Sequence, residues 1–134
     1  MTQHQSIYPD TFYRVSLKAV IRNEKGEVLV NKEYESTTYS LPGGGWEHAE
    51  SLDIALAREL KEEVSYDGSF TFTIRDTTRF WIESRQAWLL WIVLDVIPEH
   101  FTFEPGVDST EVTFVDPKSL DGGSLQEQWI ADNL

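Results

Sequence analysis

The sequence predicts a mixed α/β protein of the α+β type, with several β-strands, one central helix and one terminal helix. Apolar and polar residues alternate near the start of the chain, which is typical of a strand. A later stretch is rich in helix formers and free of glycine and proline. No internal repeat, low-complexity tract or linker is evident, so we expect residues 1–134 to form one domain.

The first third of the chain is expected to open with a β-hairpin. Residues 14–22 alternate between apolar and polar side chains, with one interruption, and predict the first strand. NEKG at 23–26 predicts a turn, and EVLVNK at 27–32 predicts the returning strand. YSLPGGG at 39–45 predicts a loop, because its proline fixes φ and its three consecutive glycines carry no side chains.

The rest of the chain predicts two helices and several strands. Helix formers dominate residues 51–64, which form the clearest helix. Further strands are expected at residues 70–74, 78–82, 87–97 and 111–115. The run at 87–97 is apolar almost throughout and predicts a central strand with both faces buried. The closing SLQEQWIADNL has helical spacing, with Leu125, Trp129 and Ile130 expected to face inward.

The composition excludes several classes of function. The chain has 23 acidic and 11 basic residues, a formal net charge of −12, which repels nucleic-acid backbones and anionic membranes. Any anionic ligand therefore needs a local cation, either a metal or placed basic side chains. There is no cysteine, so a thiolate metal site is impossible. Residues 87–94 are too few to span a bilayer and residues 1–10 lack signal-peptide character, so we expect a cytoplasmic protein with no nucleic-acid or membrane partner.

The central helix carries glutamates on its apolar side. At about 100° per residue, Glu59 and Glu63 fall within about 20° of Leu52. Glu59, Glu62 and Glu63 are i, i+3 and i+4 neighbours, so their charges converge and need compensation. One interpretation is surface pairing with basic residues of the same helix. The other is neutralisation by a divalent cation, since Mg²⁺ prefers carboxylate oxygens.

These glutamates belong to a longer pattern that runs from Gly44 to Tyr66. A Gly, five residues, a Glu and seven residues precede Arg-Glu-aliphatic-any-Glu-Glu. The positions are Gly44, Glu50, Arg58, Glu59, Leu60, Glu62 and Glu63. The pattern resembles the Nudix box of the Nudix hydrolase family, and LPGG and AVIRNEKGEVLV before it are also similar to the family. Ser65 stands where the box has Gly, so we expect the helix cap to shift by a residue or to use Gly68.

The resemblance implies a central mixed β-sheet sandwiched between helices, and a Mg²⁺ or Mn²⁺ cofactor. The metal ligands that it implies are Glu59, Glu62, Glu63, the carbonyl of Gly43, and Glu111. One of the box glutamates is expected to double as general base, and Arg58 to hold the glutamates in position. Gly44, Glu47 and Glu50 are expected to support the site. The alternatives are a plain tight turn for Gly43 and an exposed strand-end position for Glu111.

Basic and aromatic residues elsewhere are candidates for contacting the substrate. The candidates are Lys32, Trp46, Arg79 and Trp81. The basic residues, with Arg85 as an alternative to Arg79, suit phosphate contacts, although each singly also suits a solvated surface charge. The tryptophans suit stacking on a base. Trp88 and Trp91, three apart in one strand, are expected to point to opposite faces, with at least one in the core.

The leading interpretation is an enzyme that cleaves a nucleoside diphosphate linked to another group. The short chain and the AVIRNEKGEVLV segment favour a nucleoside triphosphate, as in MutT-like members of the family. The alternative is a catalytically silent Nudix-fold module that binds a nucleotide or regulates another protein. Loss of box acids would favour that alternative, and none is lost. A monomer and a homodimer both stay open.

Overall fold

The structure is a computed structural model that describes residues 12–134. Residues 1–11 lie outside it, and with them the N-terminal segment for which we expected no signal peptide. The strands are β1 (Tyr13–Val20), β2 (Val28–Glu33), β3 (Gly43–Gly45), β4 (Phe70–Ile82), β5 (Ala87–Pro98) and β6 (Ser109–Val115). The helices are α1 (Leu52–Val64) and α2 (Leu125–Asn133), with short 3₁₀ turns η1 (Glu83–Arg85) and η2 (Pro117–Ser119). Neither helix of this described part is long and apolar enough to cross a membrane.

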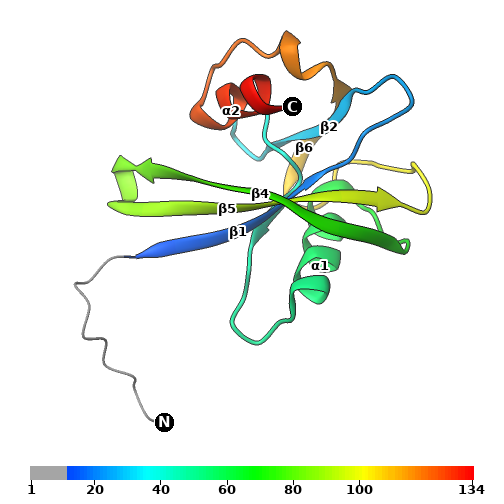
Figure 1. The fold of residues 1–134 in the computed structure, drawn as a ribbon, viewed down its shortest axis with the longest axis horizontal. Helices are drawn as coiled ribbons and strands as arrows, with labels where there is room; N and C mark the ends of the chain where they lie inside the picture. Colours follow the sequence, from blue (N-terminus) through cyan, green and yellow to red (C-terminus); the bar gives the residue numbers. More distant parts are fainter. Residues whose placement is uncertain (1–11) are drawn as a thin grey trace.

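The strands of residues 12–134 form two sheets, and helices lie on both sides of the larger one (Figure 1). The larger sheet has the order β3-β1-β5-β4, and β2 and β6 form a separate antiparallel pair. β1 is parallel to β5 and antiparallel to β3, while β4 is antiparallel to β5. The predicted mixed sheet between helices is therefore confirmed.

Two clusters of buried side chains attach the helices to the larger sheet. The cluster under α1 includes Leu17, Ala19, Leu56, Leu60 and Leu94. The cluster under α2 includes Val20, Val30, Trp91, Val93 and Ile130. Complete burial of a large apolar side chain contributes about 1.5–3 kcal/mol. Trp91 is fully buried whereas Trp88 is only partly buried, as the spacing of three in β5 predicted.

The predicted N-terminal hairpin forms only next to its turn. Arg22 bridges Val28, and the Leu29 N–H donates to the Ile21 carbonyl at 2.9 Å. Beyond that point β1 and β2 separate into different sheets, so the expectation of a paired hairpin was wrong. A strand has two hydrogen-bonding edges, and β1 uses them for β3 and β5, which leaves none for β2.

The two strands expected at residues 70–74 and 78–82 are one continuous strand, β4. Its register against β5 shifts between Ile74 and Asp76, where one extra residue forms a bulge. The bulge interrupts the regular alternation, and this is why the sequence suggested two pieces. β5 lies between β1 and β4, as its apolar sequence predicted.

The inward face of α2 differs from the prediction. Ile130 is fully buried and Trp129 packs against the same cluster, but Leu125 is 59% exposed. Leu125 lies about 140° from Ile130 around the helix, so both cannot face the sheet. Glu127 takes the inward place instead, and its carboxylate accepts hydrogen bonds from the N–H groups of Tyr39 at 3.0 Å and Gly123 at 3.2 Å.

The end of α1 uses Ser65 itself, and the expected shift of the cap was wrong. Ser65 has φ 55° and ψ 29°, in the left-handed region that favours glycine. Its N–H donates to the Lys61 carbonyl at 3.1 Å, and the Tyr66 N–H donates to the Leu60 carbonyl at 3.1 Å. The helix therefore ends where the box requires, with a serine in the strained position.

We expect Ser65→Gly to raise the free energy of unfolding by about 1 kcal/mol, because glycine adopts positive φ without the Cβ penalty. Urea denaturation of the metal-free protein measures the change. Ser65→Ala is the matched control, since it removes the hydroxyl that bonds the Pro105 carbonyl but keeps the Cβ. Equal stability of the glycine and alanine variants would contradict the strain at this position.

Candidate active site

Three glutamates of α1 converge on one cavity. Glu59, Glu62 and Glu63 line a hollow of about 560 Å³ together with Glu33, Tyr34, Gly44, Gly45, Val107 and Asp108. The leucine-side placement inferred from helical spacing is observed, because Glu59 and Glu63 are only 6% and 5% exposed. A Cβ at Gly44 would lie 2.6 Å from a carboxylate oxygen of Glu59. The absent side chain at Gly44 is therefore what lets Glu59 approach the strand.

Arg58 binds three carboxylates, those of Glu50, Glu59 and Glu62. Its Nε and Nη2 donate to the two carboxylate oxygens of Glu50 at 2.6 and 2.7 Å. Its Nη1 donates to Glu59 at 2.8 Å and to Glu62 at 3.2 Å, and Nη2 also reaches the Gly45 carbonyl at 3.0 Å. The bidentate pair with Arg58 lowers the pKa of Glu50. Arg58 is thus placed to orient the helix glutamates from outside the cavity.

Glu63 is held from the opposite side by residues that the sequence did not single out. Asn31 Nδ2 and Ser109 Oγ donate to the same carboxylate oxygen of Glu63, at 2.7 and 3.0 Å. Burial raises the pKa of Glu63 to about 7, against the opposing charge of Lys18. Burial likewise raises the pKa of Glu59, although Arg58 works in the other direction.

The residues around the cavity suit a divalent cation. Carboxylate oxygens are hard donors of the kind that Mg²⁺ and Mn²⁺ take, and the raised pKa values show that the buried negative charges lack full compensation. Within residues 12–134 no three acidic or histidine side chains are arranged around a single point at ligand distance. Arg58 donates to one oxygen of Glu59 and to one oxygen of Glu62, and a carboxylate has further acceptor sites, so both groups can bind a cation while Arg58 holds them.

Two further expected ligands have other partners. The Gly43 carbonyl accepts a hydrogen bond from Lys18 Nζ at 2.9 Å. Glu111 accepts from the hydroxyl of Tyr39, which raises the pKa of that phenol to about 12, and it is absent from the residues that line the glutamate cavity. Lys32 Nζ lies 4.6 Å from the centroid of the Tyr39 ring.

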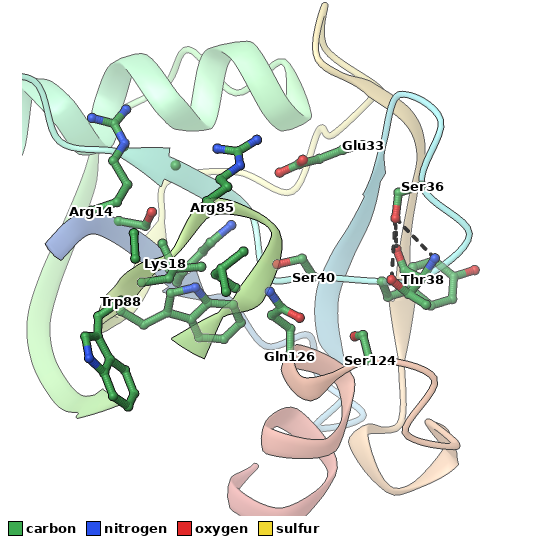
Figure 2. A pocket seen from close by; sticks show the side chains of 18 residues that line it. Arg14, Lys18, Glu33, Ser36, Thr38, Ser40, Arg85, Trp88, Ser124 and Gln126 are labelled. Carbon is green, nitrogen blue, oxygen red and sulfur yellow. Dashed lines mark hydrogen bonds between the residues drawn. The ribbon is translucent and has the colours of Figure 1, made fainter. Parts of the chain in front are cut away.

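A second cavity, the cleft, shares Glu33, Gly44 and Gly45 with the first. Figure 2 shows the side chains that line the cleft. It has a volume of about 420 Å³ and lies between the larger sheet on one side and the Ser36–Ser40 segment with the start of α2 on the other. Its aromatic and apolar wall includes Trp88, Leu89 and Trp91, and its polar wall includes Ser36, Thr38, Ser124 and Gln126. A hollow of this size that combines an aromatic wall with polar side chains can hold a small molecule.

The polar face of β1 lines the cleft. Arg14, Ser16 and Lys18 alternate along the strand on this face, and Arg85 joins them from η1. The sequence marked these β1 residues only as the polar side of a strand, which normally faces water. The signal that could have found them is a charged residue deep in a strand, because Lys18 is flanked by fully buried Leu17 and Ala19.

The expected substrate residues do not gather at either cavity. Trp46 packs against the α1 cluster and its Nε1 donates to the Glu50 carbonyl at 2.9 Å. Trp81 packs edge-on against Trp88, and Arg79 stacks on Trp88 with its guanidinium carbon 4.4 Å from the ring centroid. Glu47 lies beside Trp46, where its N–H donates to a Glu50 oxygen at 3.2 Å. Arg85, the alternative to Arg79, does line the cleft.

Known proteins resemble this chain in sequence and in fold. A family model described as NUDIX domain matches residues 12–132. The RNA pyrophosphohydrolase of Baumannia cicadellinicola is 35% identical over 71 residues, which cover 53% of this chain and 44% of the relative. The RNA pyrophosphohydrolase of Marinomonas sp. is 34% identical over 73 residues, covering 54% and 45%. The aligned part thus spans less than half the length of these curated relatives.

Solved structures agree over nearly the whole chain. The crystal structure of a MutT protein from Methanosarcina mazei Go1 has a TM-score of 0.74 and 26% identity, and the match covers 93% of this chain and 92% of that one. The dihydroneopterin triphosphate pyrophosphohydrolase of E. coli has a TM-score of 0.70 and 19% identity, with 90% and 96% covered. The second likeness shows the fold alone.

We expect Glu63 to make stability fall as pH rises in the absence of metal. Its pKa is about 7 in the folded protein and 4.5 ordinarily, so its contribution is complete below about pH 4.5 and is lost as pH rises through 7. Between pH 5 and pH 8, the wild type should therefore lose on the order of 2 kcal/mol relative to Glu63→Gln.

Urea denaturation at both pH values in EDTA measures this difference. Glu24→Gln, at an exposed turn position, is the control and should follow the wild type. Parallel pH profiles for Glu63→Gln and the wild type would show that Glu63 titrates normally.

Proposed function

Because the chain belongs to the Nudix hydrolase family, we propose that it is a Mg²⁺-dependent pyrophosphohydrolase that cleaves a nucleoside diphosphate linked to another group. The observation that carries this proposal is the convergence of Glu59, Glu62 and Glu63 on one cavity beside Gly44. Two of the three carboxylates are buried with raised pKa values, so the folded protein holds negative charge that a bound cation would stabilise.

The proposed metal ligands are the three box glutamates. Gly43 and Glu111 are left out of this set, since the first is hydrogen-bonded to an ammonium group and the second to a phenol. Mg²⁺ or Mn²⁺ held by the glutamates would tether the pyrophosphate and offset the charge that develops at phosphorus.

The chain's own residues then have distinct tasks. Arg58 and the Asn31–Ser109 pair orient the carboxylates from two sides. One of the three glutamates takes a proton from the attacking water, whose oxygen bonds to phosphorus while the bridging P–O bond breaks and the leaving phosphate keeps the electron pair. Displacing Arg58 or Asn31 would misplace the carboxylates without removing them.

The proposed substrate is a small nucleotide, and a nucleoside triphosphate is the first choice. The similar proteins named above include a MutT protein and enzymes named for RNA. The cleft beside the glutamate cavity is large enough for one nucleoside, and the net charge of −12 disfavours a long polyanion such as RNA. A cytoplasmic location, a monomeric or homodimeric state and a single domain over residues 1–134 stay predictions.

A substrate screen tests the proposal against the silent-module alternative. Nucleoside triphosphates, nucleotide sugars, dinucleoside polyphosphates, ADP-ribose and a short RNA with a 5′-triphosphate are each incubated with protein and Mg²⁺, and released phosphate or pyrophosphate is measured. Turnover of a triphosphate supports the proposal, whereas binding without turnover of any compound supports the silent module.

We expect Glu62→Gln and Glu63→Gln each to reduce Mg²⁺-dependent turnover by at least about a hundredfold, since each loses a charged metal ligand. Circular dichroism should show an unchanged fold, because glutamine keeps the size and the acceptor oxygen. Glu24→Gln should retain wild-type turnover. Turnover of either box variant at the wild-type rate would reject the metal-site assignment.

We also expect Mg²⁺ to raise the melting temperature of the wild type more than that of Glu63→Gln. A ligand that binds only the folded state stabilises it by an amount that grows with its concentration over Kd. Differential scanning calorimetry with Mg²⁺ and with EDTA gives the two shifts, and Glu24→Gln should shift like the wild type. Equal shifts for all three proteins would place the bound Mg²⁺ elsewhere.

A further inference from the structure

Lys18 is a buried cation with no carboxylate at salt-bridge distance among the described residues, although Glu33, Glu59 and Glu63 lie near enough to favour its charged form. Its side chain projects from the middle of β1 and the residue is only 5% exposed. Among residues 12–134 its ammonium group forms no salt bridge within 4.0 Å, and it donates only to the carbonyls of Leu41 at 3.1 Å and Gly43 at 2.9 Å. An ammonium has three N–H donors, so one remains. Nζ also lies 5.4 Å from the centroid of the Trp91 ring. Burial lowers the pKa of Lys18 in spite of the nearby carboxylates, so a further anion beside the ammonium would stabilise its charge.

Two more cations line the same cleft as Lys18. The guanidinium of Arg14 lies against β3, where a Cβ at Gly45 would be 1.8 Å from Nη2. Its one salt bridge, to Glu47 at 3.4 Å, joins two half-exposed side chains and is weak. Arg85 is exposed on η1 and forms no salt bridge with the described residues.

The charge of the cleft is opposite to that of the protein. Its lining has three basic residues and one acidic residue, Glu33, although the whole chain has 11 basic and 23 acidic residues. In Figure 2, Arg14, Lys18 and Arg85 lie on the side of β1 and the β4–β5 connection, while Ser124 and Gln126 approach from α2. A basic lining concentrated in one hollow of an acidic protein is suited to an anionic ligand.

The cleft and the glutamate cavity share part of their lining. Glu33, Gly44 and Gly45 line both hollows, so one ligand can extend from one to the other along β3. The glutamate cavity suits a metal-bound pyrophosphate, and the cations begin on the other side of the glycine strand. The two hollows are therefore placed for successive groups of one phosphate chain.

We propose that Lys18, with Arg14 and Arg85 at the rim, forms an anion subsite that binds the phosphoryl group next to the pyrophosphate held at the box glutamates. This proposal rests on the proposed function and narrows the substrate class to compounds with a third phosphoryl group, with free nucleoside triphosphates as the substrate. Nucleotide sugars have two phosphoryl groups and a neutral sugar, so they leave the subsite without its anion.

The subsite is testable without metal or turnover. Isothermal titration of inorganic tripolyphosphate in EDTA at low ionic strength should show binding to the wild type. Lys18→Met, which keeps the length but removes the charge, should weaken binding by about tenfold or more, since a hydrogen bond to a charged group is lost. Arg85→Gln should weaken it by a smaller factor and, being exposed, does not endanger the fold.

Arg75→Gln is the matched control, because Arg75 pairs with Asp95 and is not among the residues lining either cavity. It should keep wild-type affinity within about twofold. Arg85→Lys keeps the charge and should bind better than Arg85→Gln. Failure of the wild type to bind tripolyphosphate would overturn the subsite. Wild-type affinity in both Lys18→Met and Arg85→Gln would also overturn it, and the role of Lys18 would then be to hold β3 through its hydrogen bond to the Gly43 carbonyl.

A kinetic comparison tests the substrate class. The ratio of kcat/KM for a nucleoside triphosphate to that for ADP-ribose should fall about tenfold in Lys18→Met, mainly through KM. An unchanged ratio would overturn the third-phosphate assignment, whereas a short 5′-triphosphate RNA preferred over free triphosphates would overturn the choice of substrate. Tripolyphosphate binding without hydrolysis of any compound would reject the proposed function and leave the subsite standing.

Discussion

The burial of two carboxylates in the packing face of α1 is the constraint on which the site depends. Glu59 and Glu63 share that face with Leu56 and Leu60, so the helix cannot dock on the sheet without taking charge out of water. Surrounding residues offset part of the desolvation cost of these carboxylates. Arg58 binds one carboxylate from the exposed side of the helix, and Asn31 binds the other from β2. The pKa values of Glu59 and Glu63 stay raised, so these contacts offset only part of the desolvation cost.

The glycine strand β3 separates two hollows of opposite charge. Successive residues of a strand face opposite sides, so Gly44 faces α1 and Gly45 faces the cleft. On one side the carboxylate of Glu59 occupies the space of a missing side chain, and on the other side the guanidinium of Arg14 does the same. Because β3 has no side chains, an acidic group can pack against one face of its backbone and a basic group against the other. The two hollows therefore lie close together.

Local sequence was sufficient for α1 and for the convergence of its glutamates. The spacing of Glu59, Glu62 and Glu63 fixes their convergence, because the angle per residue in a helix does not depend on the rest of the fold. The apolar run of β5 likewise predicted its central place in the larger sheet. The predicted burial of both faces holds only for part of the strand, since residues 87–90 are partly buried and Ile97 is exposed. The same reasoning failed for Leu125, where a short helix places a glutamate inward and binds it to backbone N–H groups. It also failed for Ser65, because an apparent mismatch with the box gave no sign that serine would accept a left-handed conformation.

The sequence by itself determined the mixed fold, the helix that carries the glutamates and the glycine segment that they face, all of which follow from periodicity and backbone sterics within short segments. Only the tertiary structure decided which strands pair and what covers the polar face of β1. Alternation along a strand shows that Arg14, Ser16 and Lys18 share a face, but water and a binding cleft are both compatible with that pattern. The answer depends on contacts between residues far apart in the chain, namely the Ser36–Ser40 segment and α2 packed opposite β1, and no local pattern reports such contacts.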